Sequence, residues 1–396
     1  MVVTDDAQPI TAPPATRPHD ADRARILDAL APAGVYLGVR LVGVGVLAGM
    51  AASSGSSLLR ELTSWDGKWL LAIAEFGYAG VSADLLDAFG GRTPDTPLAF
   101  FPGYPGLVAA VGVLTGGNLV VAGLIVSAVS GVVAAYGLTR LGELVPGGSR
   151  RAGLLLTALF AAAPMGVALS MTYTEALFCA LAVWALVGVL RRQWLLAGGC
   201  AAAVGLVRPT ASSVVAAVGL AALAAVLTRR DGWRPWVGGL LATTGLLGYL
   251  GYVAARTGAL DGWFAIQRAG WGWHLDGGVA TVRYLAVVLT EGERAFDVLI
   301  VLAFVGSLVL LGLGVRMRLP WPLLVYGALL LVTVWGSDGL TNTTLRLLVP
   351  AFVLLLPVAL GLARRRTGTA VAVVAGAALA SAWFGGYALT IWPYAI

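Results

Sequence analysis

The sequence has few charged residues. Asp, Glu, Lys and Arg make up 12% of the 396 residues and hydrophobic residues 59%, whereas a soluble domain carries about 25% charged residues. Apolar runs of about twenty residues recur from residue 35 onward, each long enough to cross roughly 30 Å of hydrocarbon. A soluble protein is therefore excluded. An outer-membrane barrel is excluded too, because these runs are apolar on all sides and do not alternate. We predict an all-α, polytopic integral membrane protein.

Cysteine and histidine are scarce. Cys179 and Cys200 both lie in apolar runs, which is typical of small buried hydrophobic residues and indicates neither a disulfide framework nor a metal site. The two histidines, His19 and His274, are too few for a His-rich metal centre. The one Asp-x-Asp triplet, at residues 20–22, lies near the N-terminus. We therefore expect that the protein requires no metal and no other cofactor.

The net charge of +6 comes almost entirely from arginine, since Lys68 is the only lysine. Arginines that flank membrane spans explain this excess better than nucleic-acid binding does. The clusters are Arg140 with Arg150 and Arg151, Arg191 with Arg192, Arg229 with Arg230 and Arg234, Arg316 with Arg318, and Arg364 with Arg365 and Arg366. If all of them are cytoplasmic, the intervening helices turn on the outer side. The outer loops are then residues 55–97, 170–175, 208–210, 256–294 and 337–346.

The ends of the chain and one ambiguous segment decide the number of spans. Residues 1–25 are polar and proline-rich, which predicts a disordered cytoplasmic tail, and Arg40 enters the first span, residues 35–52, from its cytoplasmic side. Residues 26–396 form a single transmembrane domain. Residues 100–114 are predicted to be an external or re-entrant helix. This gives about eleven spans with the C-terminus outside, or about twelve if the segment crosses.

The first outer loop contains an amphipathic pattern. Its apolar residues at spacings of three and four are Trp65, Trp69, Ala72, Ile73 and Phe76. The pattern predicts a helix on the membrane surface. From the spacing alone, the tryptophans could be interfacial anchors and Asp66 a solvated residue of the first helical turn, favoured by the helix dipole.

Several motifs in order along the chain resemble those of the PIG-V-like mannosyltransferases, which are polytopic GT-C glycosyltransferases. The motifs are Trp65-Asp66-Gly67-x-Trp69, Ile73-Ala74-Glu75-x-Gly77-Tyr78, Ala99-Phe100-Phe101-Pro102-x-Tyr104-Pro105, Tyr173-Thr174-Glu175, Arg208-Pro209-Thr210, and Leu345-Arg346 with Pro350. The resemblance extends over residues 65–357. It departs from the family at Asp66, which stands alone where many GT-C relatives have an acidic pair, and at residues 84–97, which have no counterpart.

This resemblance implies a GT-C-like bundle that transfers mannose from a polyprenyl-phosphate donor to a hydroxyl of a lipid, glycan or protein acceptor, with inversion at the outer face. It places the catalytic carboxylate at Asp66, with Glu75 as the reserve base or a simple polar-face residue. Arg208 and Arg346 are the candidates for the donor phosphate, since guanidinium forks match phosphate oxygens. The alternative is that both arginines only flank the membrane.

A wider set of residues is predicted to line the sugar or acceptor pocket: Trp65, Lys68, Trp69, Glu75, Tyr104, Tyr173, Glu175, Gln267, Arg268, Trp271 and His274. Some have another interpretation. Thr172 and Glu175 match a helix capping box, and the tryptophans match interfacial anchoring. Pro209 fits the first position of a helix whose N-terminus could also meet the phosphate.

Two other functional classes stay open: a transporter or flippase, and a catalytically inactive scaffold related to the enzymes. A transporter typically places polar residues near the membrane midplane, whereas here they gather in outer loops. We expect a bacterial plasma-membrane protein with a cytoplasmic N-terminus and an extracytoplasmic site. Its expected partners are membrane lipids, a lipid-linked sugar and an acceptor, but no nucleic acid.

Overall fold

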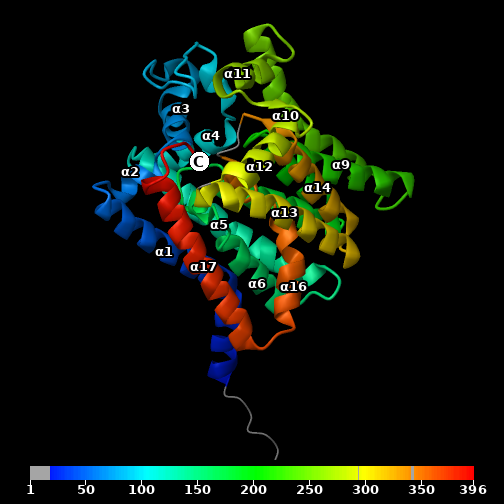
Figure 1. Ribbon diagram of the computed structural model, residues 1–396. Helices are drawn as coiled ribbons and strands as arrows, with labels where there is room; N and C mark the ends of the chain where they lie inside the picture. The colour runs from blue at the N-terminus through cyan, green and yellow to red at the C-terminus, as the bar shows by residue number, and fades with distance from the viewer. Residues whose placement is uncertain (1–17, 293, 340–342) are drawn as a thin grey trace, which may run out of the picture.

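The computed structural model describes residues 18–292, 294–339 and 343–396. The regular secondary structure of these residues is helical apart from one short strand pair (Figure 1). The α-helices are α1 (Pro18–Ser53), α2 (Leu58–Leu62), α3 (Asp66–Gly80), α4 (Gly103–Gly112), α5 (Leu119–Leu144), α6 (Arg150–Ala161), α7 (Glu175–Leu190), α8 (Trp194–Gly205), α9 (Ala211–Leu227), α10 (Arg234–Thr257), α11 (Gly262–Trp271), α12 (Val279–Glu291), α13 (Ala295–Arg316), α14 (Trp321–Trp335), α15 (Thr344–Leu347), α16 (Leu356–Ala363) and α17 (Thr367–Thr390). The 3-10 helices are η1 (Thr96–Ala99), η2 (Val113–Thr115), η3 (Gly166–Ser170) and η5 (Phe352–Leu355). Strands β1 (His274–Leu275) and β2 (Ser337–Asp338) pair antiparallel. The predicted all-α class is confirmed.

Within the described residues, α1, α5, α10, α13 and α17 are long and apolar enough to cross a membrane. The chain is therefore a multi-pass membrane protein. Further apolar helices of 10–17 residues include α7, α8, α9 and α14, and the total of eleven or twelve spans stays a prediction. Helix α4 has 10 residues and rises roughly 15 Å, half the hydrocarbon thickness. This length favours an external or re-entrant α4.

Helices α8 and α10 pack closely through small residues. A Cβ at Gly198 would lie 2.4 Å from the carbonyl oxygen of Gly238, and one at Gly245 would lie 1.8 Å from that of Ala202. A larger side chain at either glycine would push the backbones apart. Because lipid supplies no hydrophobic drive for helix association, such close backbone packing is how membrane helices hold together.

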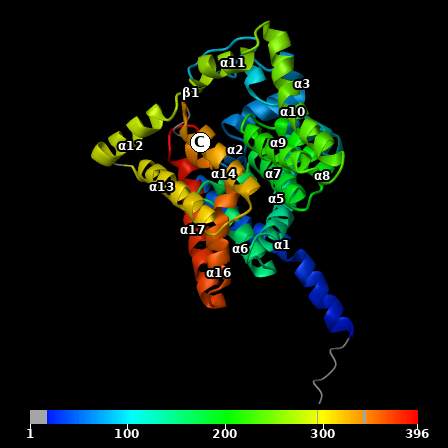
Figure 2. The ribbon, with the colours of Figure 1, turned by 90° about the vertical axis from the view of Figure 1, so that its right-hand side faces the viewer.

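Helices α3, α4 and α11 and one end of α10 form a cap at the top of the molecule, while α12 and α13 project to one side (Figures 1 and 2). Phe101, Tyr249 and Trp263 form part of the core of the cap. Residues 256–294, predicted as a loop, contain α11, β1 and α12. Trp263 and Gly270 lie on the buried face of α11.

The predicted surface helix of the first loop is α3, but its packing differs from the expectation. Trp69, Leu70 and Ile73 are buried against α4 and neighbouring segments, whereas Trp65 and Phe76 are exposed. The apolar side of α3 is therefore mainly a protein contact.

The beginning of α1 also differs from the expectation. The helix starts at Pro18, so residues 18–25 belong to it and not to a disordered tail, while residues 1–17 lie outside the described part. Arg40 lies inside the first span, as the sequence predicts. It is 6% exposed, and its guanidinium binds Ala161 of α6 and Ser170 of η3.

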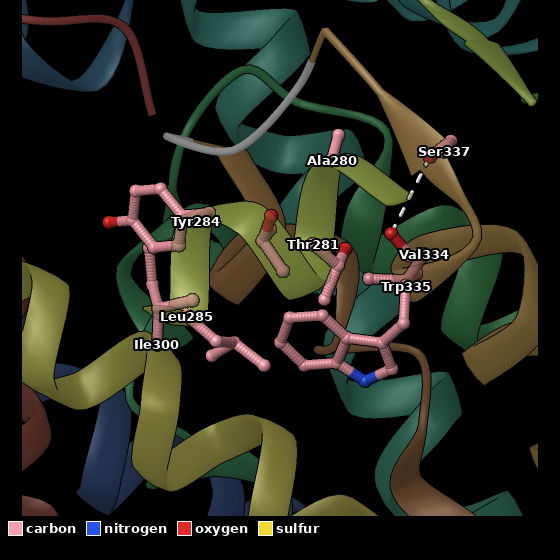
Figure 3. A pocket seen from close by; sticks show the side chains of 9 residues that line it. Ala280, Thr281, Tyr284, Leu285, Ile300, Val334, Trp335 and Ser337 are labelled. Atoms are coloured by element: carbon pink, nitrogen blue, oxygen red, sulfur yellow. Dashed lines mark hydrogen bonds between the residues drawn. The ribbon is translucent and has the colours of Figure 1, made fainter. Parts of the chain in front are cut away.

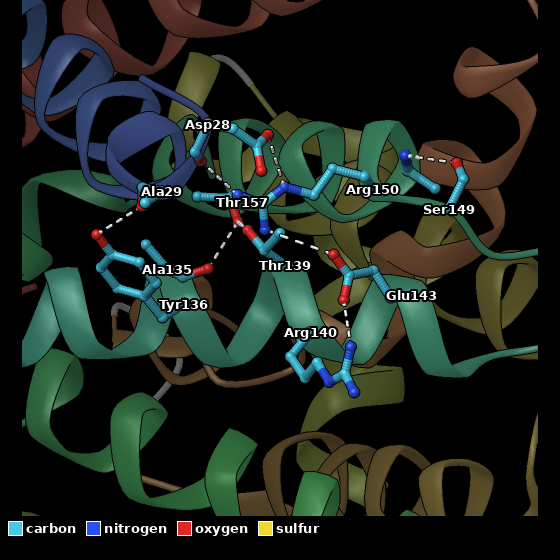
Figure 4. A network of polar contacts seen from close by, with 11 residues as sticks. Asp28, Ala29, Ala135, Tyr136, Thr139, Arg140, Glu143, Ser149, Arg150 and Thr157 are labelled. Carbon is cyan, nitrogen blue, oxygen red and sulfur yellow. Dashed lines mark hydrogen bonds and ion pairs between the residues drawn. The ribbon is translucent and has the colours of Figure 1, made fainter. Parts of the chain in front are cut away.

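The helix ends that carry arginine clusters are joined by polar contacts (Figure 4). Arg150, at the start of α6, contacts the Asp28 carboxylate of α1 at 3.4 Å and also lies 3.4 Å from Glu143. Arg140 lies 2.7 Å from the other oxygen of Glu143. These contacts hold the ends of α1, α5 and α6 together.

Further contacts connect clusters that are distant in sequence. Arg151 donates a 2.8 Å hydrogen bond to the carbonyl of Arg365, and Arg192 lies 3.8 Å from Asp231. The first contact joins the α5–α6 turn to the α16–α17 turn, and the second joins the α7–α8 and α9–α10 turns. This grouping is what a common location on one membrane side requires.

The positive-inside rule predicts that this arginine-bearing end is cytoplasmic. In a variant with Cys179 and Cys200 replaced by alanine, a cysteine at Ser82 should react with an impermeant maleimide in intact cells. A cysteine at Arg365 should react only after permeabilisation. The reverse labelling pattern would contradict the predicted orientation.

Candidate functional site

Four segments that are far apart in the sequence bring charged side chains to one place. Asp66 begins α3, Glu175 begins α7, Arg208 precedes α9 and Arg346 lies in α15. Arg346 Nη1 donates to Asp66 Oδ2 at 2.6 Å, and Arg208 Nη1 donates to Glu175 Oε1 at 2.9 Å. Arg346 Nε lies 3.5 Å from the same Glu175 oxygen. The four residues, here called the charge cluster, come from four of the predicted outer loops.

The charge cluster contains two positive and two negative groups and is largely buried. The Glu175 side chain is 1% exposed and the two arginines 9–10%, whereas that of Asp66 is 31% exposed. Burial by itself lowers the pKa of Arg346, but the Asp66 and Glu175 carboxylates outweigh it and raise that pKa above its ordinary value. Arg346 therefore stays charged. Asp66 is the member that a ligand from solvent reaches most easily.

Tyr173 lies against the charge cluster. The Arg346 guanidinium carbon is 5.0 Å from the centre of its ring, within the range of a cation–π contact. Burial raises the pKa of the Tyr173 phenol well above its usual value, and the Asp66 carboxylate adds to this effect. Tyr173 is thus a neutral, buried phenol whose ring lies against the Arg346 guanidinium.

The Trp65-Asp66-Gly67 motif explains how Asp66 reaches Arg346. Trp65 has φ 52° and ψ −122°, a backbone conformation that costs a non-glycine residue about 1–3 kcal/mol and that occurs often at functional sites. A Cβ on Gly67 would lie 2.6 Å from Thr172 Oγ1. The motif therefore turns the chain sharply into α3 and lets its first turn lie against the Thr172 segment.

The predicted capping box is wrong. The Thr172 amide and hydroxyl both contact the carbonyl of Leu62, and Thr174 is the residue that precedes α7, without a side-chain cap. Both ends of the motif therefore make tertiary contacts: Thr172 with Leu62, and Glu175 with Arg208 and Arg346. Pro209 is also not the first helical residue, because α9 begins at Ala211.

Other predicted pocket residues lie at the surface. Lys68 and Glu75 are exposed positions of α3. Arg268 forms an exposed ion pair with Asp261 at 2.8 Å. His274 is exposed in β1, where one ring nitrogen contacts a backbone carbonyl. None of these is among the residues that pair in the charge cluster.

The aromatic candidates form part of the cap. Trp69 stacks on Phe100 at a centroid distance of 5.4 Å and meets the edge of Trp271 at 6.2 Å. Gln267 donates to the carbonyl of Ala99 at 3.1 Å, so its amide is used to hold η1. These contacts give the tryptophans and the glutamine packing roles in addition to any contact with a sugar.

Tyr104 lies in the first turn of α4 and connects this helix to α5. It is fully buried, and its hydroxyl lies 3.0 Å from Ser127 Oγ. The amide of the preceding Gly103 donates to the carbonyl of Leu206 at 2.7 Å, and a Cβ there would lie 2.7 Å from the same oxygen. The Phe-Phe-Pro-Gly-Tyr-Pro motif therefore braces the segment that carries Arg208.

A cleft beside α15 was not predicted from the sequence (Figure 3). Its volume is about 340 Å³ including the open mouth. The lining residues are Ala280, Thr281, Tyr284, Leu285, Ile300, Val334, Trp335, Ser337 and Thr344. They belong to separate segments and carry no local motif. Its lining mixes apolar side chains with hydroxyl groups, and it reaches α15, the helix that holds Arg346.

No protein-family model matches the sequence, and no curated protein matches it.

Solved structures do match the fold of this chain. ArnT from Cupriavidus metallidurans bound to undecaprenyl phosphate has a TM-score of 0.53 and 16% identity. The alignment covers 86% of this chain and 63% of ArnT. The chain has a GT-C glycosyltransferase fold. The archaeal oligosaccharyltransferase AglB from Archaeoglobus fulgidus, in complex with an inhibitory peptide and a dolichol-phosphate, has a TM-score of 0.46 and 14% identity, over 90% of this chain and 55% of AglB.

The ion pair between Glu175 and Arg208 predicts how charge-removing substitutions combine. Glu175→Gln leaves two buried arginines with one carboxylate and should lower the free energy of unfolding by about 3–5 kcal/mol. Adding Arg208→Gln makes the numbers of positive and negative groups in the cluster equal again. The double variant should therefore recover at least about 1.5 kcal/mol of the free energy of unfolding. Thermal unfolding of both single variants and the double variant in detergent measures this coupling. Additive losses would show that the two residues do not interact.

Proposed function

We propose that the protein transfers a sugar, most specifically mannose, from a polyprenyl-phosphate donor to an acceptor hydroxyl at the extracytoplasmic face, with inversion. The observation that carries this proposal is the charge cluster, in which a partly exposed carboxylate lies beside two buried arginines. The undecaprenyl phosphate named for ArnT supports a lipid-linked donor. The resemblance to the PIG-V-like mannosyltransferases supports mannose, since its motifs contain all four residues of the cluster.

In this proposal Asp66 Oδ1 takes the proton of the acceptor hydroxyl. The acceptor oxygen attacks the anomeric carbon from the side opposite the phosphate, and the bond between that carbon and the phosphate oxygen breaks. The electron pair of that bond stays on polyprenyl phosphate, which gains one negative charge. Arg208 and Arg346 supply fixed cations for this charge, in the manner of other pre-organised electrostatic sites.

The surroundings of the charge cluster suit a lipid-linked donor. Exposed apolar side chains on the membrane-spanning helices offer a surface for isoprenoid units. A metal is not part of the proposal, because the charges of both carboxylates are already matched by guanidinium groups. Chelator-resistant turnover is therefore expected.

The direct test incubates purified protein with polyprenyl-phosphate-mannose and a membrane lipid extract, with and without EDTA. Polyprenyl-phosphate-glucose is the matched donor control. A mannosylated product supports the proposal, and a glucosylated product alone would change the assigned sugar. Absence of both products would favour the inactive-scaffold alternative. Movement of unchanged donor across proteoliposomes would instead favour the flippase alternative.

Asp66→Asn keeps the size of the side chain but removes its basicity. If Asp66 is the base, turnover should fall by about 10²- to 10⁴-fold while donor binding survives. The measurement is kcat alongside donor affinity. Glu75→Gln is the matched control on the same helix, and it should leave kcat and donor affinity nearly unchanged. An active Asp66→Asn enzyme would transfer the role of base to another carboxylate, and loss of donor binding would make Asp66 a binding residue.

Arg208→Gln and Arg346→Gln each remove a charge-assisted hydrogen bond worth about 1.5–3 kcal/mol, so donor use should weaken roughly 10- to 150-fold. Lysine should rescue only part of the loss, because an ammonium group cannot form a forked contact. Arg268→Gln changes an exposed arginine and serves as the control. Wild-type kinetics in both cluster variants would show that neither arginine binds the donor.

A further inference from the structure

Arg40 is a buried charge inside the first membrane-spanning helix. It is 6% exposed, and no described carboxylate forms an ion pair with it. A charged side chain within a membrane span is costly and usually serves a function. The role proposed for the charge cluster does not use this residue.

The guanidinium of Arg40 instead binds the two ends of a neighbouring turn. Nη1 donates to the carbonyl of Ala161 at 2.8 Å, and Nε donates to Ser170 Oγ at 3.0 Å. Ala161 is the last residue of α6, and Ser170 is the last residue of η3. Carbonyl groups at a helix C-terminus lack helical partners and carry the negative end of the helix dipole. Arg40 therefore finds its electrostatic partner in backbone.

Two glycines from different elements leave the space that this guanidinium fills. A Cβ on Gly43 of α1 would lie 2.9 Å from Arg40 Nη2. A Cβ on Gly166 of η3 would lie 2.7 Å from Arg40 Nη1. The surrounding backbone thus accommodates an arginine from both sides, which indicates a specific site for this side chain.

The turn held by Arg40 leads directly into the charge cluster. Residues 162–174, here called the connector, join α6 to α7 and contain only the short η3. Later in the connector, the Met171 carbonyl accepts a hydrogen bond from Ser127, and the Thr172 amide donates to Leu62. Tyr173 and Glu175 follow at once. Arg40 holds the first half of the connector, and the second half carries the site.

We infer that Arg40 is a positioning residue that acts through the connector to place Tyr173 and Glu175 against Arg346. Its effect on turnover rests on the proposed function, whereas its effect on connector order does not. Without the guanidinium, the Ala161 carbonyl and the Ser170 hydroxyl lose their partner in a water-poor interior and the connector shifts. A displacement of about 1 Å is enough to cost roughly 10²-fold in rate.

The experiment compares Arg40→Gln, Arg40→Lys and a control, Thr157→Val. Thr157 is a buried hydroxyl that bonds Thr139 and the Ala135 carbonyl, so its loss disturbs the α5–α6 contact without touching the connector. Hydrogen exchange of connector amides in Arg40→Gln should rise at least about tenfold, with α5 unchanged. In Arg40→Lys, the exchange rate of these amides should rise less, since the lysine ammonium can reach one of the two acceptors. Thr157→Val should leave the connector at the wild-type rate.

Turnover provides a second measurement. Arg40→Gln should lower kcat by roughly 10- to 100-fold. In a Glu175→Gln background, the same substitution should lower kcat by less than about threefold, because residues that act through one another are not additive. A general loss of stability would give the same fold-loss in both backgrounds and would overturn the inference.

The exchange measurement separates this inference from the proposed function. If the wild-type chain transfers no sugar, the proposed function fails, but faster connector exchange in Arg40→Gln still supports the positioning role. Unchanged connector exchange in that variant overturns it, with or without transferase activity. If Arg40→Gln does not fold, the Arg40→Lys comparison decides by the same criterion.

Discussion

The contact between Arg346 and Asp66 is the constraint on which the site depends. It joins residues 280 positions apart, and Glu175 connects it to Arg208 through a second ion pair. A buried ion pair is not in itself a strong source of stability, since desolvation offsets most of the attraction. Three buried charges and the partly exposed Asp66 instead impose a precise meeting point on α3, α7, α9 and α15.

Close backbone approaches make that meeting possible. Gly67 lets α3 lie against Thr172, and Gly103 lets α4 lie against Leu206. The positive φ of Trp65 completes the turn into α3. A Cβ or a relaxed backbone at these positions would separate segments that the charges need to have together. Gly67, Gly103 and Trp65 thus affect the electrostatic interactions of the site, because they set the distances between its charged groups.

The sequence predicted the helical class and several local elements but not the contacts between them. Apolar runs predicted the all-α class, the three- and four-residue spacing after Trp65 predicted the helix at α3, and the arginine clusters predicted the loops whose residues converge. The number of spans and their orientation stay predictions. Local patterns failed where a distant segment competed for the same group, as when Leu62 and the arginines took both ends of the capping box at Thr172 and Glu175. The cleft beside α15 and the partners of Arg40 combine several segments, and no spacing within one segment encodes them.

The proposed chemistry keeps the charge of the site constant. Before transfer, Asp66 carries one negative charge beside Arg346, and the donor phosphodiester carries another. Proton transfer neutralises Asp66 at the same step in which the leaving phosphate gains a second charge. Arg346 can then follow the negative charge from the carboxylate to the phosphate, which requires only a short shift of a side chain already held by Glu175. In a site of low dielectric constant, a reaction that moves charge without creating it avoids the largest desolvation cost. In the proposed mechanism, an arginine shared between the base and the leaving group therefore gives the contact between Asp66 and Arg346 a role in the transfer.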